Sequence, residues 1–307
     1  MIVAHSSHPP QPVFQPVPGL DVEQFAGQAA VPASRYTFEQ LADLYNQTRV
    51  DYIVPMPMNA RRLQEYVHAY DINLDLSVVA LNPQGDVTGL GMLGLRENRA
   101  WISRLGVLPE RRGRRTGLFI TEHLLHQARL AGARLAQLEV VKGNVPAHSL
   151  FRKLGFRETR ELLIIRRPPG TAPLIPPPVG SSATEMDADG IAICLAMREP
   201  GASWLEETRS LYRAGSLQGL WVTLPNGSGG WVVYQQTAFQ LTHIVCGTPA
   251  SAHEPVASAL LHHLHRLHPR RDSKVENIPA DSPYLPAFTN AGYLEAFRRV
   301  EMDLRLA

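Results

Sequence analysis

The chain has 307 residues, of which 44% are hydrophobic, and a formal net charge of +2. This length suffices for two domains, and the apolar content can fill two cores. A charge so close to neutral argues against nucleic-acid binding by the whole chain. There is no apolar run long enough to span a membrane, and the first ten residues lack the charged and apolar regions of a secretory signal. We therefore expect a cytoplasmic protein that binds neither nucleic acid nor membranes.

In chain order, the first clear elements are two helices, predicted over residues 38–49 and 60–70, with a loop rich in Met and Pro between them. A strand over residues 101–107 then leads into a turn of glycine and arginine. The helix after this turn has apolar positions three and four apart, and Gly132 stands where it should end. The turn is thus expected at a helix N-terminus.

This turn has the composition of an anion-binding site. The first N–H groups of a helix have no partner within it, and the macrodipole adds partial positive charge there. Gly113 and Gly117 lack a Cβ, so a pyrophosphate could approach the backbone. Arg112, Arg114 and Arg115 add permanently charged donors. The turn alone is weak evidence, because an arginine cluster is often a solvated surface.

A second segment, after a predicted strand at residues 135–141, strengthens this interpretation. Its distinctive residues are Asn144, Ala147, Leu150, Phe151, Gly155 and Phe156. Together the two segments resemble the GNAT superfamily of acyl-CoA N-acyltransferases. In that family an R/Q-x-x-G-x-G/A loop holds the CoA pyrophosphate, and an N-x-x-A-x-x-L-Y-x-x-x-G-F segment lies along the pantetheine.

The resemblance implies acetyl-CoA as co-substrate and no metal. Arg112 matches the first position of the loop and Gly117 the last, while Arg115 replaces the middle glycine. The residues that would contact CoA are Leu105, Val107, Arg112, Gly113, Arg114, Arg115, Thr116, Gly117, Asn144, Ala147 and Phe151.

Two family residues that move protons are missing. Phe151 replaces the tyrosine that can protonate the CoA thiolate, and Trp101 stands where many members have a glutamate base. A general acid or base supplies about two to four powers of ten in rate, whereas positioning can supply more, so the loss slows transfer without forbidding it. Glu139 and His148 are candidate substitute bases. Alternatively, Glu139 is a solvated strand-edge carboxylate and His148 a helix-surface residue.

In the resembling family, the helix-loop-helix ahead of the sheet covers the acceptor groove. Tyr45, Asp51 and Tyr52 are therefore candidates for binding the acceptor, a small-molecule or peptide amine, and the Asp51 carboxylate could attract its positive charge. The alternative is that Asp51 ends a helix and the nearby methionines fill gaps in the core.

The second half resembles a degenerate copy of the first. Residues 166–182 are rich in proline and read as a linker. Beyond them we expect a helix at 202–212, a hairpin of strands 220–224 and 231–237, a strand at 241–246, a helix at 256–267 and a strand at 294–306. Phe288, Gly292 and Tyr293 match Phe151, Gly155 and Phe156 at a constant offset of 137 (288 minus 151).

These observations predict an α/β fold of tandem GNAT-like domains, each with a mixed sheet flanked by helices. The expected divisions are a catalytic domain at 1–165, the linker at 166–182 and a degenerate domain at 183–307. The second anion turn, at 248–255, carries two prolines and an acid, so we expect one CoA site per chain.

The histidine cluster and the two cysteines of the second half are expected to have structural roles. The histidines at 262–268 spread around their helix without a carboxylate or cysteine companion, so a solvated or interface surface, which could serve a homodimer, is favoured over a metal site. Cys194 and Cys246 are expected to be buried apolar residues.

The function expected from the sequence is direct transfer of an acetyl group from acetyl-CoA to a primary amine. Two alternatives remain. The missing tyrosine and glutamate could mark a CoA-binding sensor without turnover, and the arginine turn could instead bind another polyanion.

Overall fold

The computed structural model describes residues 23–25, 27–170 and 175–306. The chain forms two compact units. Among the described residues, one comprises those up to residue 63 together with residues 73–93 and 104–131, and the other comprises residues 64–72, 94–103 and those from residue 132 onward. Helices and strands alternate in both, which confirms the predicted mixed α/β fold.

The first half of the chain contains the elements expected around the anion turn. They are β1 (Glu23–Phe25), β2 (Gln28–Pro32), α1 (Phe38–Gln47), α2 (Ala60–Ala69), β3 (Ile72–Leu81), β4 (Val87–Arg96), β5 (Arg99–Val107), α3 (Thr116–Leu130), β6 (Leu135–Val141), α4 (Val145–Lys153) and β7 (Arg157–Arg167).

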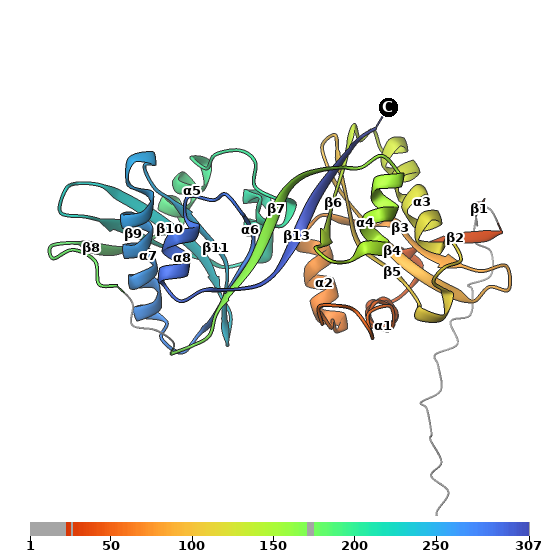
Figure 1. Cartoon of the computed structure of the whole chain (residues 1–307), viewed down its shortest axis with the longest axis horizontal. Helices are drawn as coiled ribbons and strands as arrows, with labels where there is room; N and C mark the ends of the chain where they lie inside the picture. The colour runs from red at the N-terminus through yellow and green to blue at the C-terminus, as the bar shows by residue number, and fades with distance from the viewer. Residues whose placement is uncertain (1–22, 26, 171–174, 307) are drawn as a thin grey trace, which may run out of the picture. The chain divides into compact units, whose positions relative to one another are not determined.

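Glycines in β4 explain how closely helix α3 packs against this strand (Figure 1). A Cβ atom on Gly91 would lie 2.6 Å from Cγ2 of Ile120 and 2.8 Å from Cδ1 of Leu124, and both of these α3 side chains are fully buried. Larger residues would hold the helix away from the strand. The N-terminus of α3, and with it the anion turn, is therefore positioned by the packing of its apolar face on β4.

The second half begins after residue 175. Its elements are β8 (Ser182–Met186), α5 (Ala188–Ala196), the 3₁₀ turn η3 (Trp204–Glu206), α6 (Thr208–Ala214), β9 (Leu217–Thr223), β10 (Gly229–Gln236), β11 (Gln240–Gly247), α7 (His253–Leu267), β12 (Asp272–Pro279), α8 (Leu285–Asn290) and β13 (Leu294–Arg305).

Strand β13 lies between two strands from the first half of the chain. The strands of the second unit follow in the order β6, β13, β7, β12, β11, β10, β9, β8. β13 pairs antiparallel with β6, from Arg299 opposite Val141 to Arg305 opposite Leu135, and antiparallel with β7 on its other side. Figure 1 shows β7 and β13 side by side as two long strands. The sheet therefore joins segments far apart in sequence.

The apolar core of the second unit lies between helices α7 and α8 and strands β9 to β12. Leu260, Leu264 and Phe288 come from the helices. Leu163 and Ile165 of β7 belong to the same core. The strand that ends the first half of the chain thus helps to build the core of the second half.

The helix expected at residues 202–212 is interrupted. η3 ends at Glu206 and α6 begins at Thr208, because Glu207 has extended backbone angles (φ −59°, ψ 146°). Its carboxylate accepts hydrogen bonds from Arg96 (2.9 Å) and Arg99 (2.7 Å). We attribute the break to these ion pairs, which hold Glu207 outside a helical conformation.

The expectation of a solvated surface is wrong for two histidines of α7, while the alternative of an interface stays a prediction. His262 and His265 are only 8% and 2% exposed. Burial lowers the pKa of His265 to about 3, so this imidazole is neutral at physiological pH. Its ring lies 5.6 Å from that of Tyr293 in the core. The pattern fails because α7 is buried on more than one side.

Across the described ranges, none of the helices combines the length and apolarity needed to cross a membrane.

Candidate active site

The backbone of the predicted anion turn leaves donors available at the start of α3. Gly113 has φ +75° with open space where a Cβ would lie. Arg115, in place of the family's middle glycine, has φ +62° and ψ 10°, a left-handed conformation that costs a residue with a Cβ about 1 kcal/mol. Arg115 is the N-cap of α3, and no side chain among the described residues caps this end. The first N–H groups of the helix can therefore bind an external acceptor.

Arg112 and Asp51 form an ion pair beside this turn. Nη1 and Nη2 of Arg112 donate to the two carboxylate oxygens of Asp51 at 2.6 and 2.8 Å, and Nη2 also donates to the carbonyl of Thr48 at 3.2 Å. The hydrogen bonds from Arg112 lower the pKa of Asp51 below its usual value. Asp51, expected to attract an amine, thus neutralises the first arginine of the anion turn. Both side chains are exposed, so the pair is open to competition from another anion.

The two tyrosines expected at the acceptor groove contact arginines. Tyr45 is fully buried, and its hydroxyl accepts a hydrogen bond from Arg104 at 2.9 Å. The guanidinium carbon of Arg49 lies 3.9 Å from the ring centroid of Tyr52, a cation–π contact. Tyr45 is therefore a core residue rather than part of an open groove wall, whereas Tyr52 remains partly exposed.

Strand β5 changes direction beside the turn. Its described pairing with β6 joins residues 99–102 to residues 135–138 and is followed by Arg104 at φ +51°. The Leu105 carbonyl accepts a hydrogen bond from Arg49 at 2.9 Å. A Cβ on Gly106 would lie 2.2 Å from Oγ1 of Thr48, so only glycine lets the end of α1 rest on β5. This contact fixes the strand end that leads to Val107.

The predicted pantetheine segment forms the expected loop and helix in the second unit. Oδ1 of Asn144 accepts from the Ala147 N–H at 3.3 Å and caps α4. Phe151 is buried, with its ring edge-on to Phe156 at 5.9 Å. A phenyl ring has no proton to give, so this position offers no general acid.

Of the two candidate bases, Glu139 has the more unusual environment. Its side chain is 6% exposed and lies 3.5 Å from Arg299. Burial raises its pKa to about 7, although the charge of Arg299 opposes the rise. His148, on the surface of α4, is more exposed, and its Nε2 atom lies 3.1 Å from Glu158 of β7. A pKa near neutrality suits a general base, so Glu139 is the stronger candidate.

Aromatic packing occupies the position of the family's glutamate base. Trp101 is 3% exposed and stacks on Trp204, with ring centroids 5.8 Å apart. The rings of Tyr66 and Tyr70 lie 6.1 and 6.0 Å from it. Trp101 therefore packs in the interior of the second unit and cannot act as a proton acceptor.

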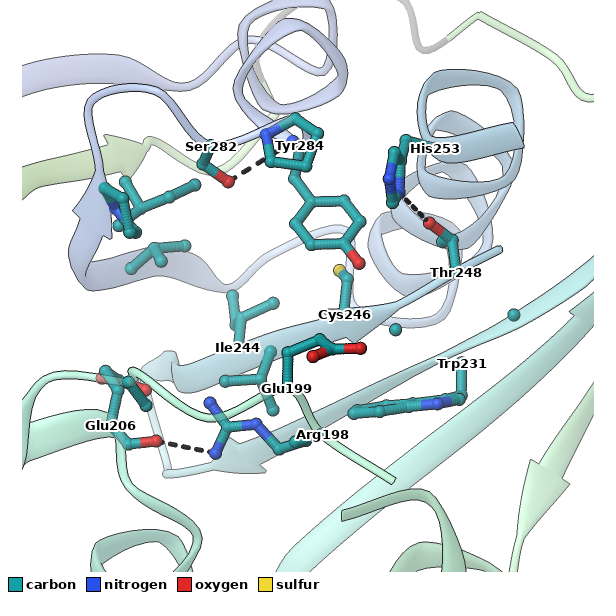
Figure 2. A pocket seen from close by; sticks show the side chains of 18 of the residues that line it. Arg198, Glu199, Glu206, Trp231, Ile244, Cys246, Thr248, His253, Ser282 and Tyr284 are labelled. Atoms are coloured by element: carbon teal, nitrogen blue, oxygen red, sulfur yellow. Dashed lines mark hydrogen bonds between the residues drawn. The ribbon is translucent and has the colours of Figure 1, made fainter. Parts of the chain in front are cut away.

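A cavity of about 650 Å³ lies where β11 and β12 separate. These parallel strands pair only at residues 240–241 and 272–273 in the described register. Farther along, His243 and Asn277 take φ values of +50° and +57°. Figure 2 shows the Tyr284 hydroxyl, the Glu199 carboxylate and the Trp231 ring directed into the space. Beyond the resemblance of the second half to the first, no pattern in the sequence predicts this cavity.

Within the described residues, no group of three or more His, Cys, Asp or Glu side chains could hold a metal ion. Both cysteines have free thiols.

Comparisons with known proteins agree with this architecture. Residues 39–156 match the sequence model of the acetyltransferase (GNAT) family. A GCN5-related N-acetyltransferase from Sphaerobacter thermophilus has a TM-score of 0.70 at 18% identity, covering 92% of this chain and 97% of that one. A tandem GNAT protein from the clavulanic acid biosynthesis pathway has a TM-score of 0.65 at 16% identity, covering 93% and 98%. A putative acetyltransferase from Pyrococcus horikoshii has a TM-score of 0.62 at 14% identity, covering 93% and 92%. The search of curated proteins found no match.

Residues 39–156 thus resemble in sequence the GNAT acetyltransferase family, whose members transfer acyl groups from acyl-CoA. At these identities the solved structures establish the fold alone. The structural similarity extends over more than nine-tenths of this chain, and one of the similar structures is a tandem GNAT protein.

Proposed function

We propose that the chain is an N-acetyltransferase that moves an acetyl group from acetyl-CoA directly to a primary amine. The observation that carries this proposal is the turn at residues 112–117. It combines an α3 N-terminus without a side-chain cap, Gly113 in open space and exposed arginines. Such a turn binds the oxygens of a pyrophosphate through backbone N–H groups and guanidinium donors.

In this proposal the chain positions the reactants and moves one proton. The amine nitrogen bonds to the thioester carbonyl carbon, the carbon–sulfur bond breaks, and the thiolate takes its proton from water because Phe151 has none to give. Glu139 accepts the proton that the amine loses, either directly or through water. Its pKa near 7 leaves a substantial fraction ionised at neutral pH.

Acetyl-CoA titration tests the turn. We expect Arg112→Glu combined with Gly117→Asp to weaken binding at least about tenfold, because both changes place negative charge at the helix N-terminus. Arg129→Glu, an exposed charge reversal near the opposite end of α3, is the matched control and should keep its affinity. Unchanged affinity in the double variant would remove the turn from the proposal.

An assay for thiol release over a panel of amines tests the reaction. Release that requires both acetyl-CoA and an amine supports transfer. Tight binding of acetyl-CoA without release for any amine would instead identify a sensor.

A further inference from the structure

We propose that the cavity between β11 and β12 binds an organic ammonium ion carried on an apolar body. The site is separate from the acyl-CoA turn and does not depend on the proposed transferase activity. Its volume of about 650 Å³ is in the range of small-molecule sites. The cavity exists because β11 and β12 stop pairing after residues 241 and 273, and nothing in the described chain fills the space between them.

Hydrogen-bond acceptors without donors give the cavity its preference for a cation. Glu199 lines the cavity with its carboxylate directed inward (Figure 2), and no hydrogen bond to it occurs among the described residues. Glu206 lines the wall and is 7% exposed, and its Oε2 atom is buried without a hydrogen-bond partner in the part of the chain that the structure describes. A buried carboxylate oxygen left unpaired is costly, and an ammonium N–H would satisfy it.

The cationic groups near the cavity are already engaged. Nη1 of Arg198 donates to the Glu206 carbonyl at 2.7 Å and to Thr208 at 3.3 Å. His243 lies 3.6 Å from the other Glu206 oxygen, Oε1. Burial lowers the pKa of His243, but the interaction with Glu206 outweighs it and the net shift is upward. The third lining carboxylate, Glu276, is balanced by Lys274 and by Arg299, which lies 3.1 Å away.

Aromatic and apolar walls suit the body of such a ligand. The Trp231 ring lies over Gly247, where a Cβ would approach the ring to 2.2 Å, so glycine is needed for the ring to lie flat against the strand. The rings of Tyr284 and His253 meet edge to face at 5.4 Å on the other side. Aromatic faces attract cations, and Ile244, Val275 and Phe288 complete an apolar lining.

The same cavity is not suited to binding a nucleotide. Residues 248–255 contain no lysine or arginine, and the first turn of α7 carries Glu254 and Pro255. Nδ1 of His253 is already bound to the Thr248 hydroxyl at 2.7 Å. Cys246 also offers no nucleophile, since burial raises the pKa of its thiol to about 12. The cavity is therefore a binding site without covalent chemistry of its own.

Three probes of similar size and different charge test this proposal on the full chain. Phenethylamine, 2-phenylethanol and 3-phenylpropionate would each be titrated by calorimetry, with acetyl-CoA titrated in the same samples. We expect the amine to bind at least about tenfold more tightly than the alcohol, and the carboxylate not to bind, because only the ammonium donates to both carboxylates.

Variants locate the binding. Glu206→Gln and, separately, Glu199→Gln should each weaken phenethylamine binding several-fold or more while leaving acetyl-CoA affinity unchanged. Glu199 is exposed, so its variant should fold even if Glu206→Gln does not. Asp189→Asn, which removes an exposed charge from α5, is the matched control and should have no effect.

Three results would overturn the proposal. They are no binding of phenethylamine, binding unaffected by both glutamate variants, and acetyl-CoA occupying this cavity in crystals. Because acetyl-CoA affinity is measured independently, the first two results would leave the transferase proposal intact, whereas acetyl-CoA in this cavity would also contradict the turn as its binding site.

Discussion

The Arg112–Asp51 ion pair connects the anion turn to the loop that follows α1. It links residues 61 positions apart, so no local pattern in the sequence could have revealed it. The sequence did indicate a guanidinium donor on the turn and a carboxylate on the loop between α1 and α2. Their pairing means that an incoming pyrophosphate must compete with a carboxylate for the same guanidinium group.

We therefore expect Asp51→Asn to strengthen acetyl-CoA binding by about two- to tenfold at low salt. The variant removes a negative charge near the bound phosphates and frees Arg112, and the gain should shrink as salt screens the exposed charges. Calorimetric titration at two salt concentrations measures the effect. Asp43→Asn, which removes an exposed carboxylate from α1, serves as control. Weaker binding in Asp51→Asn would instead mean that the ion pair shapes the turn for its ligand.

Arg115 shows how far a motif can be read residue by residue. Its position in the loop motif predicts a glycine, and the left-handed φ of +62° shows that the backbone keeps the glycine conformation after the residue has changed. The motif could thus be recognised despite the substitution. By contrast, a family pattern does not specify the hydrogen bond that the Tyr45 hydroxyl accepts from Arg104.

At the scale of elements, local patterns predicted the strands and helices around the turn well. Apolar periodicity and glycine positions suffice for α3, β5 and β6, because these elements are set by nearby residues. The place of β13 between β6 and β7 could not be predicted, since its partners lie more than a hundred residues away. The break at Glu207 was missed for the same reason, as it depends on Arg96 and Arg99.

Deleting residues 294–306 tests the importance of β13. The deletion removes buried Val300 and Met302 and leaves facing edges of β6 and β7 without partners. We expect loss of the cooperative unfolding transition and increased aggregation, measured by near-ultraviolet circular dichroism and by light scattering. Replacing exposed Leu294 by Ser within an intact β13 is the control and should retain the transition. A folded, monomeric deletion variant would show that the other strands are sufficient.

For the whole molecule, buried ionisable groups make stability depend on pH. The pKa of Glu139 is raised from 4.5 to about 7, so the folded protein keeps a proton that the unfolded chain has lost in this range. The unfolding free energy should therefore fall as pH rises from about 4.5 to 7. His265 affects the stability of the folded protein at acidic pH. With a pKa lowered to about 3, it penalises the folded state as pH falls below 6.5.

We expect Glu139→Gln to reduce the loss of stability between pH 5 and pH 8 by about 1.4 kcal/mol or more, the value of one pKa unit. Urea denaturation at several pH values measures it. Glu39→Gln, at an exposed position of α1, provides a control with the same chemical change. If the free energy of unfolding of the variant depends on pH as that of the original protein does, Glu139 is ionised in the folded protein throughout this range.

The position of β13 also constrains the order of events during synthesis. Strand β6 ends at Val141, and the segment that pairs with it is completed at Arg305, 164 residues later (305 minus 141). At the usual pace of about 5 to 20 residues per second, a ribosome needs roughly 8 to 33 seconds to deliver that partner. Through this interval the nascent chain carries an unpaired strand edge within the segment that matches the acetyltransferase family. We expect chaperones to bind the chain during this interval.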